Sequence, residues 1–448
     1  MADLPDIAAH RLSADALRAN FGDAEPPLTD AQAVVEANRC YFCYDAPCIQ
    51  ACPTGIDIPG FIRGIATGNV KGAALRILEE NIMGGTCARA CPTEILCEQA
   101  CVRNAQEAKP IDIGGLQRHA TDHLFDAQIQ PFTRAAPTGK RVAVVGAGPA
   151  GLACAHALSR QGHEIVVYEA RAKAGGLNEY GLAAYKMADE FAAREVAFIL
   201  AIGGITIENN RALGRDLQLG ELTTQFDAVF LGMGQAGVNA LNDDAHPMDG
   251  FLPAVDFIAA LRQADDKSTV PVGRRVVVIG GGNTAIDAAV QSKRLGAEDV
   301  TLVYRRGADD MSATTAEQEW AQTNDVRIKR WARPARLHAT DGAVRSVEFE
   351  RTKMGADGKL TGTGEFFTVD ADMVLTAIGQ TFVPDPVTRD ANAVLELDRG
   401  RIRVDADHKT SLPNVFAGGD CVQGQDLTVS AVQHGKLAAR AIDRLLRS

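Results

Sequence analysis

The strongest constraint on the fold of this chain is an internal repeat, in which residues 141–170 and 275–306 resemble each other residue type by residue type. Each copy reads as a strand, a glycine-rich turn, a helix and a second strand. A βαβ unit with such a turn builds a parallel sheet and is typical of dinucleotide-binding domains. The repeat therefore predicts an α/β fold that contains two Rossmann-like domains.

The turn of the first copy, GAGPAG, follows its predicted strand directly. Its glycines permit a tight turn and let a pyrophosphate approach the N-terminus of the next helix. Glu169 ends the following strand, where its carboxylate can accept hydrogen bonds from ribose hydroxyls. Because strand, helix and acidic residue agree, a dinucleotide site is favoured over a purely structural turn. The predicted cofactor-binding residues of this turn are Gly146, Gly148, Pro149, Ala150 and Gly151.

The second copy has the turn GGGNTA, with Gly280 and Gly282 and with Ala285 in the third glycine position. It ends on Arg305 and Arg306, whose guanidinium groups would favour the 2′-phosphate of NADPH. The arginines could instead lie on a solvated face or stack on adenine, so NADH remains an alternative. Two different dinucleotide sites in one chain suggest one bound flavin and one mobile nicotinamide cofactor.

The boundaries follow from changes in pattern along the chain. Helical periodicity surrounds a cysteine-rich N-terminal part, and a Pro-, Thr- and Ala-rich stretch separates it from the first strand. A late strand and turn, NVFAGGDCV, and a helical pattern from Thr428 to Leu446 suit completion of the first Rossmann-like domain, with the second inserted into it. The predicted division is a helical domain at 1–133, a first FAD-binding part at 134–250, an NAD(P)-binding domain at 251–375 and a second FAD-binding part at 376–448.

Eight of the ten cysteines lie in the N-terminal part: Cys40, Cys43, Cys48, Cys52, Cys87, Cys91, Cys97 and Cys101. The first four have the spacing C-x2-C-x4-C-x3-C-P, close to the bacterial ferredoxin run, in which the last cysteine ligates another cluster. The string CARACPTEILCEQAC then supplies the missing ligands of a second cluster. Counted this way, eight thiolates fill two 4Fe-4S clusters, while two zinc sites with four thiolates each are the alternative.

Composition narrows the class of protein. No apolar run in the 448 residues approaches the roughly 18 that a membrane span requires, and the acidic N-terminus does not resemble a secretory signal, so we expect a cytoplasmic protein. A net charge of -11 argues against nucleic acid as a partner. Cys154 reads as a buried core thiol, and Cys421 alone cannot form a redox-active pair. No residue is assigned a catalytic role, because hydride transfer to a flavin needs none.

The chain resembles the flavin subunits of bacterial NAD-dependent dihydropyrimidine dehydrogenases and the N-terminal half of the single-chain animal enzymes. The resemblance covers nearly all of residues 35–448 and rests on CYFCYDAPCIQACP, CARACPTEILCEQAC, PIDIGGLQR, GAGPAGL, GGGNTAIDAA, AIGQT and VFAGGD. The wider family includes the glutamate synthase small subunit, which carries Glu rather than Gln near GGLQ. Gln117 therefore favours the dihydropyrimidine dehydrogenase group.

The resemblance implies roles for individual residues. One 4Fe-4S cluster would be held by Cys40, Cys43, Cys48 and Cys101, and the other by Cys52, Cys91, Cys97 and Gln117, with Cys87 a spectator. The FAD would be lined by Gly176, Leu177, Lys186, Asp420 and Thr428. The nicotinamide cofactor would meet Asn283, Thr284, Arg305, Arg306, Ala377 and Gly379. Lys186 stands where the animal enzyme has arginine, and Ser312 stands where many relatives have proline.

The function implied is electron input. NADH or NADPH would reduce FAD, and electrons would pass singly through two 4Fe-4S clusters to a partner subunit with FMN and further clusters, which reduces the 5,6 double bond of uracil or thymine. Rival interpretations are a subunit like that of glutamate synthase or of a ferredoxin-linked reductase. A rival from a different class is a redox sensor that binds FAD and NAD(P)H without turnover.

Overall fold

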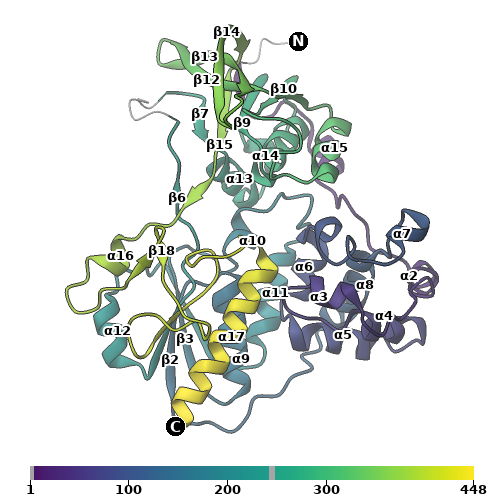
Figure 1. The fold of residues 1–448 in the computed structure, drawn as a ribbon, viewed down its shortest axis with the longest axis vertical. Helices are drawn as coiled ribbons and strands as arrows, with labels where there is room; N and C mark the ends of the chain where they lie inside the picture. Colours follow the sequence, from purple (N-terminus) through teal and green to yellow (C-terminus); the bar gives the residue numbers. More distant parts are fainter. Residues whose placement is uncertain (1–4, 242–247) are drawn as a thin grey trace. The chain divides into compact units, whose positions relative to one another are not determined.

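The computed structural model describes residues 5–241 and 248–448, and the chain divides into two compact units (Figure 1). Unit one comprises Met1–Ala24, Tyr180–Ala188 and Val238–Thr381, and unit two comprises Glu25–Glu179, Asp189–Gly237 and Phe382–Ser448. Unit two holds a helical part and a parallel sheet, and unit one holds a second parallel sheet. The predicted class, a helical N-terminal part followed by two Rossmann-like sheets of which the second is inserted into the first, is confirmed. The four-range domain division stays a prediction.

The sheet of unit two has five parallel strands in the order β19-β5-β2-β3-β4. The strands are β2 (Arg141–Val145), β3 (Glu164–Glu169), β4 (Ile205–Asn209), β5 (Ala228–Leu231) and β19 (Val415–Ala417). Alternate side chains pack on opposite faces, as the two-residue period of a strand requires. Val142 and Val144 belong to the same cluster as residues of α9 (Pro149–Arg160) and α17 (Thr428–Arg447), whereas Ala143 and Val145 pack with α12 (Leu219–Gln225).

Helix α17 crosses α9 at very short range. A Cβ atom on Gly435 would lie 2.1 Å from the carbonyl oxygen of Ala150 and 3.0 Å from the backbone nitrogen of Cys154. The strand β19 and the helix α17 come from beyond residue 381, while β2, β3, β4 and β5 precede residue 238. The last part of the chain therefore completes the sheet and covers one of its faces.

The helical part of unit two is built from short, capped helices. They are α2 (Asp30–Ala37), α3 (Pro47–Ala51), α4 (Ile58–Ala66), α5 (Val70–Glu80), α6 (Gly84–Ala90), η1 (Thr93–Ile95), α7 (Asn104–Glu107) and α8 (Ile113–Asp126). Side chains of Thr29, Asp57, Asn69 and Asp112 accept backbone hydrogen bonds at the starts of α2, α4, α5 and α8. Cys48 lies within α3 and Cys87 within α6, and the other six N-terminal cysteines lie at helix ends or in the loops between the helices. Unit two also contains α11 (Phe191–Leu200), α16 (Asp385–Thr388), β17 (Leu397–Asp398) and β18 (Arg401–Ile402), and α10 (Leu177–Tyr180) leads out of it.

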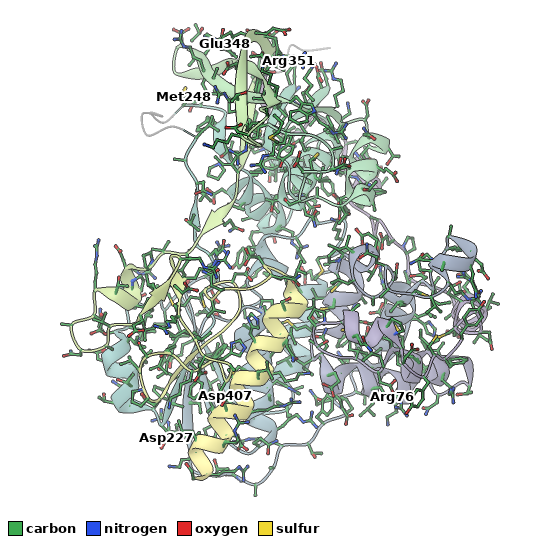
Figure 2. The ribbon with its side chains drawn as sticks, in the orientation of Figure 1. Arg76, Asp227, Met248, Glu348, Arg351 and Asp407 are labelled. Atoms are coloured by element: carbon green, nitrogen blue, oxygen red, sulfur yellow. The ribbon has the colours of Figure 1, made fainter. Side chains whose placement is uncertain are left out.

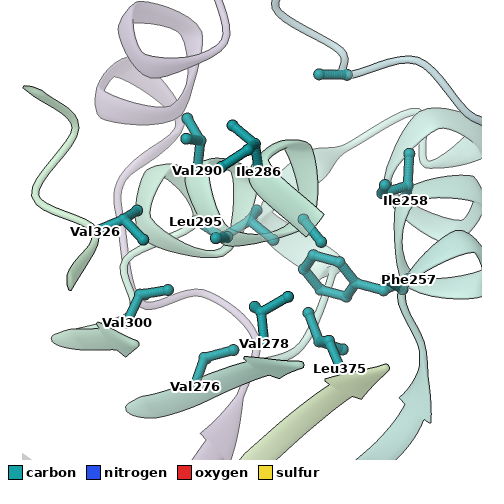
Figure 3. Packing of buried hydrophobic residues seen from close by; sticks show 14 of the residues in the cluster. Phe257, Ile258, Val276, Val278, Ile286, Val290, Leu295, Val300, Val326 and Leu375 are labelled. Atoms are coloured by element: carbon teal, nitrogen blue, oxygen red, sulfur yellow. The ribbon is translucent and has the colours of Figure 1, made fainter. Parts of the chain in front are cut away.

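Unit one is built on the parallel sheet β11-β10-β9-β15-β7. Its strands are β7 (Phe251–Pro253), β9 (Arg275–Gly280), β10 (Asp299–Val303), β11 (Arg327–Lys329) and β15 (Met373–Ala377), and its helices are α13 (Ala254–Gln263), α14 (Asn283–Arg294) and α15 (Thr315–Thr323). Figure 3 shows Val276, Val278 and Leu375 of the sheet beneath side chains of α13 and α14. Alternate residues of β9 thus belong to two clusters, Val276 and Val278 to the one with α13 and α14, and Val277 and Ile279 to another.

Two features of unit one are absent from the sequence-based prediction. Strand β1 (Ile7–Ala8) pairs with β8 (Val272–Gly273), so the N-terminal residues, with α1 (Ala14–Asn20), belong to this unit. A three-stranded antiparallel sheet consists of β12 (Ala332–Thr340), β13 (Ala343–Met354) and β14 (Leu360–Asp370). Figure 2 labels Glu348 and Arg351 on β13.

The short elements η2 (Lys267–Thr269), β6 (Gly237–Val238) and β16 (Gln380–Thr381) complete the described structure. Within the described ranges, no helix combines the length and apolar character needed to cross a membrane.

Replacement of Gly435 by alanine should lower the free energy of unfolding by about 1 kcal/mol, because overpacking typically costs about 1–3 kcal/mol and the gain in helix propensity offsets about 1 kcal/mol of that cost. The new methyl group would overlap a backbone carbonyl that cannot rotate away. Gly114→Ala on α8 is the matched control, since its Cβ would meet its nearest atoms at 3.5 Å. Thermal unfolding of the two variants measures the difference, and equal melting temperatures would contradict the close crossing.

Candidate functional site

The first glycine turn joins β2 to α9 and leaves open space at the helix N-terminus. Gly146 has φ +98°, and a Cβ there would lie 2.3 Å from the carbonyl oxygen of Gly232. A Cβ on Gly151 would lie 1.9 Å from the carbonyl oxygen of Gly146, so both positions require glycine for packing. Gly148, the N-cap of α9, has only the Cα of Gly176 as a neighbour, at 3.8 Å from a hypothetical Cβ. The absence of a side chain at Gly148 is therefore not required by packing within the chain, and it fits a pyrophosphate at the N-terminus of α9.

Glu169 lies at the carboxyl end of β3, beside this turn. Its side chain accepts hydrogen bonds from the backbone N–H of Ala147 and of Arg171, both at 2.8 Å. The carboxylate is almost completely buried, at 7% exposure. Glu169 thus holds the turn in place, and the remaining lone pairs of its two oxygens can accept from ribose hydroxyls.

The turn after β19 brings Asp420 to the same edge of the sheet. A Cβ on Gly419 would lie 3.0 Å from the Cβ of Ala150, which places this turn against the start of α9. Burial raises the pKa of Asp420 to about 6, with a further contribution from Asp426 that Arg401 opposes. A partly buried carboxylate of this kind can accept hydrogen bonds from a ligand that supplies hydroxyl groups, as the ribityl chain of FAD does.

Thr428 begins α17 and completes the candidate FAD site. Its hydroxyl donates to the side-chain oxygen of Asn178 at 3.0 Å. Asn178 follows Leu177, which is 37% exposed, and Gly176, whose Cβ would lie 2.8 Å from the Cα of Gly148. Unit two therefore brings together its predicted FAD-lining residues, and they fit the cofactor. Their individual roles stay predictions.

Lys186 is the exception among the predicted FAD-lining residues, because it belongs to unit one. Its ammonium group pairs with Asp287 at 3.0 Å and with Glu317. Burial lowers the pKa of Lys186, but the two carboxylates raise it by more, so the pKa lies above its usual value. The structure explains Lys186 through this buried ion pair, and contact with FAD stays a prediction.

The second glycine turn joins β9 to α14 in unit one. A Cβ on Gly280 would lie 2.2 Å from the carbonyl oxygen of Ala377, and one on Gly282 would lie 3.0 Å from the hydroxyl of Ser312. Asn283 and Thr284 form the first turn of α14, and the side-chain oxygen of Asn283 is buried without a hydrogen-bond partner. Such an orphaned acceptor fits a donor group on a bound ligand.

Arg305 and Arg306 follow β10 beside this turn. No ion pair between described residues involves either guanidinium group, and the Nε atom of Arg306 is buried without a hydrogen-bond partner. The backbone between β10 and β12 is fixed, since the hydroxyl of Thr352 donates to the carbonyl of Arg305 at 2.7 Å. Two unpaired guanidinium groups at a helix N-terminus fit a phosphate group.

Ala377 and Gly379 lie at the carboxyl end of β15, the strand next to β9. Asn239 holds this turn: its backbone N–H donates to the carbonyl of Gly379 at 3.1 Å, and its side-chain amide donates to the carbonyl of Ile378 at 3.1 Å. The sequence carries no motif that would have indicated Asn239. All predicted nicotinamide-binding residues therefore lie in unit one, where three neighbouring strands end.

The first cysteine group surrounds a cavity in the helical part. The cavity is lined by Cys40, Cys43, Cys48 and Cys101, together with apolar side chains of Ile58, Ile62, Ile111 and Ile113. Burial raises the pKa of Cys48 to about 12, and the neighbouring Cys40 and Cys101 add to this effect. Thiolates in such a place need a cationic partner, which the iron of a cluster supplies. These four residues fit the first predicted cluster.

The second group adjoins the first. Burial raises the pKa of Cys97, and Glu98, Cys52 and Cys48 raise it further. A hydrogen bond with Cys87, burial, and the nearby thiols of Cys97 and Cys52 raise the pKa of Cys91. Among the described residues, no group of three or more His, Cys, Asp or Glu side chains is placed to hold a single metal ion.

Gln117 and Cys87 compete for the fourth place in the second group. The amide nitrogen of Gln117 donates to the carbonyl of Gly84 at 2.7 Å, and the side chain is 7% exposed. Because the nitrogen is occupied, the amide oxygen is the atom left to bind iron. Cys87 is 3% exposed and lies beside Cys91. The donor set thus fits a second cluster with either residue, and the assignment to Gln117 stays a prediction.

Two dinucleotide turns on parallel sheets and a cysteine-rich helical part define a flavoprotein oxidoreductase with iron-sulfur centres. Residues 140–435 match the family model of pyridine nucleotide-disulphide oxidoreductases. Residues 17–129 match the model of dihydropyrimidine dehydrogenase domain II, 4Fe-4S cluster. The match at the cysteine-rich part favours 4Fe-4S centres over the zinc alternative.

Curated relatives narrow the class. The glutamate synthase [NADPH] small chain of Escherichia coli K12 is 35% identical over 94% of this chain and 93% of its own length. The NAD-dependent dihydropyrimidine dehydrogenase subunit PreT of the same strain is 36% identical over 94% of this chain and 96% of its own. The chain belongs to this family of NAD(P)H-oxidising, FAD-binding electron-transfer proteins with an N-terminal 4Fe-4S domain.

Solved structures share the fold at lower identity. Mycobacterium tuberculosis FprA in complex with NADPH has a TM-score of 0.58 and 19% identity, covering 69% of this chain and 84% of that one. The thioredoxin reductase of T. acidophilum has a TM-score of 0.53 and 18% identity, covering 69% of this chain and 100% of that one. These likenesses agree with the two Rossmann-like sheets.

The affinity for FAD should fall as the pH is lowered through about 6, because the ionised form of Asp420 accepts hydrogen bonds and protonation removes that capacity. Asp420→Asn should bind FAD more weakly at pH 8 and lose this pH dependence. Titration of flavin fluorescence between pH 5 and 8, at the same ionic strength, compares the two proteins. If the FAD affinity of Asp420→Asn fell with pH in the same way as that of the native protein, the pH dependence would come from a group other than Asp420.

Proposed function

We propose that this chain is the electron-input subunit of a dihydropyrimidine dehydrogenase. It oxidises NADPH or NADH at FAD and delivers single electrons, through two 4Fe-4S clusters, to a partner subunit that reduces uracil or thymine to the 5,6-dihydro form. The overall identities of 35% and 36% do not separate this function from that of a glutamate synthase small chain. The observation that carries the proposal is Gln117, the residue that distinguishes the two groups, with its amide nitrogen bound to the carbonyl of Gly84.

FAD, when bound, supplies the ability to accept a hydride and to release electrons one at a time. The residues of the chain position and shield it. Gly148 and the N-terminus of α9 would receive the pyrophosphate, Glu169 the ribose, and Asp420 and Thr428 the ribityl end. Arg305 and Arg306 would hold the 2′-phosphate of NADPH. Neither forms an ion pair with another described residue, which favours NADPH over NADH.

The contacts in unit two favour an order for the clusters. Lys436 of α17 donates to the carbonyl of Thr54, two residues after Cys52, and to the carbonyl of Glu80. The same helix begins at Thr428, in the candidate FAD site. These contacts support the group containing Cys52 and Gln117 as the one next to the flavin, which would leave the group around Cys40 for transfer to the partner.

The function is tested by anaerobic addition of NADPH or NADH to the purified chain. We expect iron in the protein, bleaching of the flavin and repeated reduction of an artificial acceptor, with faster bleaching by NADPH. Binding without bleaching would favour the redox sensor, and zinc in place of iron would overturn the assignment. The partner is tested by mild co-purification: an FMN-containing subunit that turns over uracil or thymine supports the proposal, and a glutamate-forming one supports the glutamate synthase alternative.

Gln117→Leu should disturb one cluster while the flavin stays bound, because it removes the amide oxygen assigned to iron. Cys87→Ser is the matched control, since the proposal makes Cys87 a spectator. Iron content, cluster spectra and midpoint potentials report the difference. If Cys87→Ser lost iron and Gln117→Leu did not, Cys87 would be the fourth ligand of the cluster and Gln117 the spectator.

A further inference from the structure

Asn178 is a buried amide that no motif in the sequence explains. It is 2% exposed and lies directly after Leu177 in unit two. Its side-chain oxygen accepts from the hydroxyl of Thr428 at 3.0 Å. Its side-chain nitrogen lies 3.6 Å from the sulfur of Met83, to which it donates. Both ends of the amide are thus engaged, one toward the candidate FAD site and one toward the helical part.

Met83 continues the connection toward the iron-sulfur centres. It is the N-cap of α6 and is 1% exposed, and its backbone N–H donates to the side chain of Asn81 at 3.0 Å. The next residue, Gly84, accepts the hydrogen bond from Gln117 at 2.7 Å. An unbroken series of bonded or hydrogen-bonded groups therefore runs from Thr428 through Asn178, Met83 and Gly84 to Gln117.

An amide matches the chemistry of this position. It offers an acceptor to the hydroxyl of Thr428 and a donor to the thioether of Met83, which is a weak acceptor. Aspartate would accept from Thr428 but could not donate to sulfur, and leucine would do neither. These bonds also restrain the separation of the groups they join, because leaving one unmade costs a buried or partly buried group a hydrogen bond.

We propose that Asn178 is a positioning residue for electron transfer, which sets the separation of the flavin site and the Gln117 cluster and forms the contact route between them. The inference rests on the proposed function. Asn178 acts through Met83 and Thr428 and touches neither the nicotinamide cofactor nor iron. Its substitution should therefore slow the passage of electrons from flavin to cluster and leave hydride transfer to the flavin nearly unchanged.

The test follows the two phases after NADPH is mixed anaerobically with the complete, cofactor-loaded chain. In Asn178→Leu the second phase, cluster reduction, should slow about tenfold, because small displacements in a transfer geometry have effects of this order or larger, while flavin bleaching stays within about twofold. Asn414→Leu is the matched control: its amide donates to the carbonyl of Thr223 at the opposite, amino end of β19. The control should leave both phases unchanged. An unchanged second phase in a flavin- and iron-replete Asn178→Leu protein would overturn the proposal.

Further variants separate positioning from general loss of structure. Asn178→Asp keeps the acceptor for Thr428 and should fold even if Asn178→Leu does not, yet it should still slow the second phase. Met83→Leu removes the sulfur at nearly constant volume and should act in the same direction. The double variant Met83→Leu/Asn178→Asp should be no slower than Asn178→Asp alone, and additive slowing would show that Asn178 does not act through Met83. If the native chain itself lacked a second phase, the proposed function would fail instead.

Discussion

The structure of unit two depends on the close crossing of α9 and α17 at Gly435. Because the crossing is set by a glycine against a backbone carbonyl, it fixes α17 along its length relative to the first glycine turn. With this contact in place, Thr428 at the start of α17 meets Asn178, and Lys436 reaches the loop after Cys52. A single helix thus couples the candidate cofactor site to the cysteine-rich part.

A buried carboxylate provides a second connection between these parts. Glu195 of α11 is 1% exposed and accepts hydrogen bonds from the backbone N–H and the hydroxyl of Thr86 in α6. Burial raises the pKa of Glu195 to about 7, although the bonds from Thr86 and the nearby Arg89 oppose the shift. Phe125 and Phe191 fill the space next to Gly85, where a side chain would collide with both rings. The start of α6, which also holds Gln117 through Gly84, is therefore fixed by polar and apolar contacts together.

Sequence patterns predicted the parts of the fold that repeat a local rule. The two glycine turns, their strands and the cysteine spacing each depend on neighbours within a short segment, so the βαβ units at residues 141–170 and 275–306 could be predicted. The pairing of Ile7–Ala8 with Val272–Gly273 could not be predicted, because a two-residue strand has no period and its partner is remote in sequence. The strands β12 and β14 are largely exposed, so their apolar alternation is weak.

In the candidate site, too, residues set by local sequence could be predicted, and residues set by tertiary contacts could not. Gly146, Gly151 and Gly280 could be assigned because their conformations and close contacts exclude other residues. Tyr185, completely buried with its hydroxyl 3.2 Å from Asp287, gave no signal, since a lone aromatic residue in a loop has no pattern. The inclusion of Tyr180–Ala188 in unit one depends on such tertiary contacts. Asn178 and Asn239 were missed for the same reason: each satisfies partners that only the folded chain brings to it.

The two copies of the repeat differ in what holds the turn, and this difference matches their proposed ligands. In the first copy the carboxylate of Glu169 binds the N–H of Ala147, so the turn is held from its own sheet. In the second, a Cβ on Gly281 would lie 2.4 Å from the ring of Tyr304, whose hydroxyl donates to the carbonyl of Asp310. The aromatic ring fixes the second turn without using a charge, which leaves the adjacent Arg305 and Arg306 available to a ligand. A turn held by the carboxylate of its own copy suits a resident flavin. A turn flanked by guanidinium groups that form no ion pair within residues 5–241 and 248–448 suits a phosphate-bearing cofactor that binds and leaves.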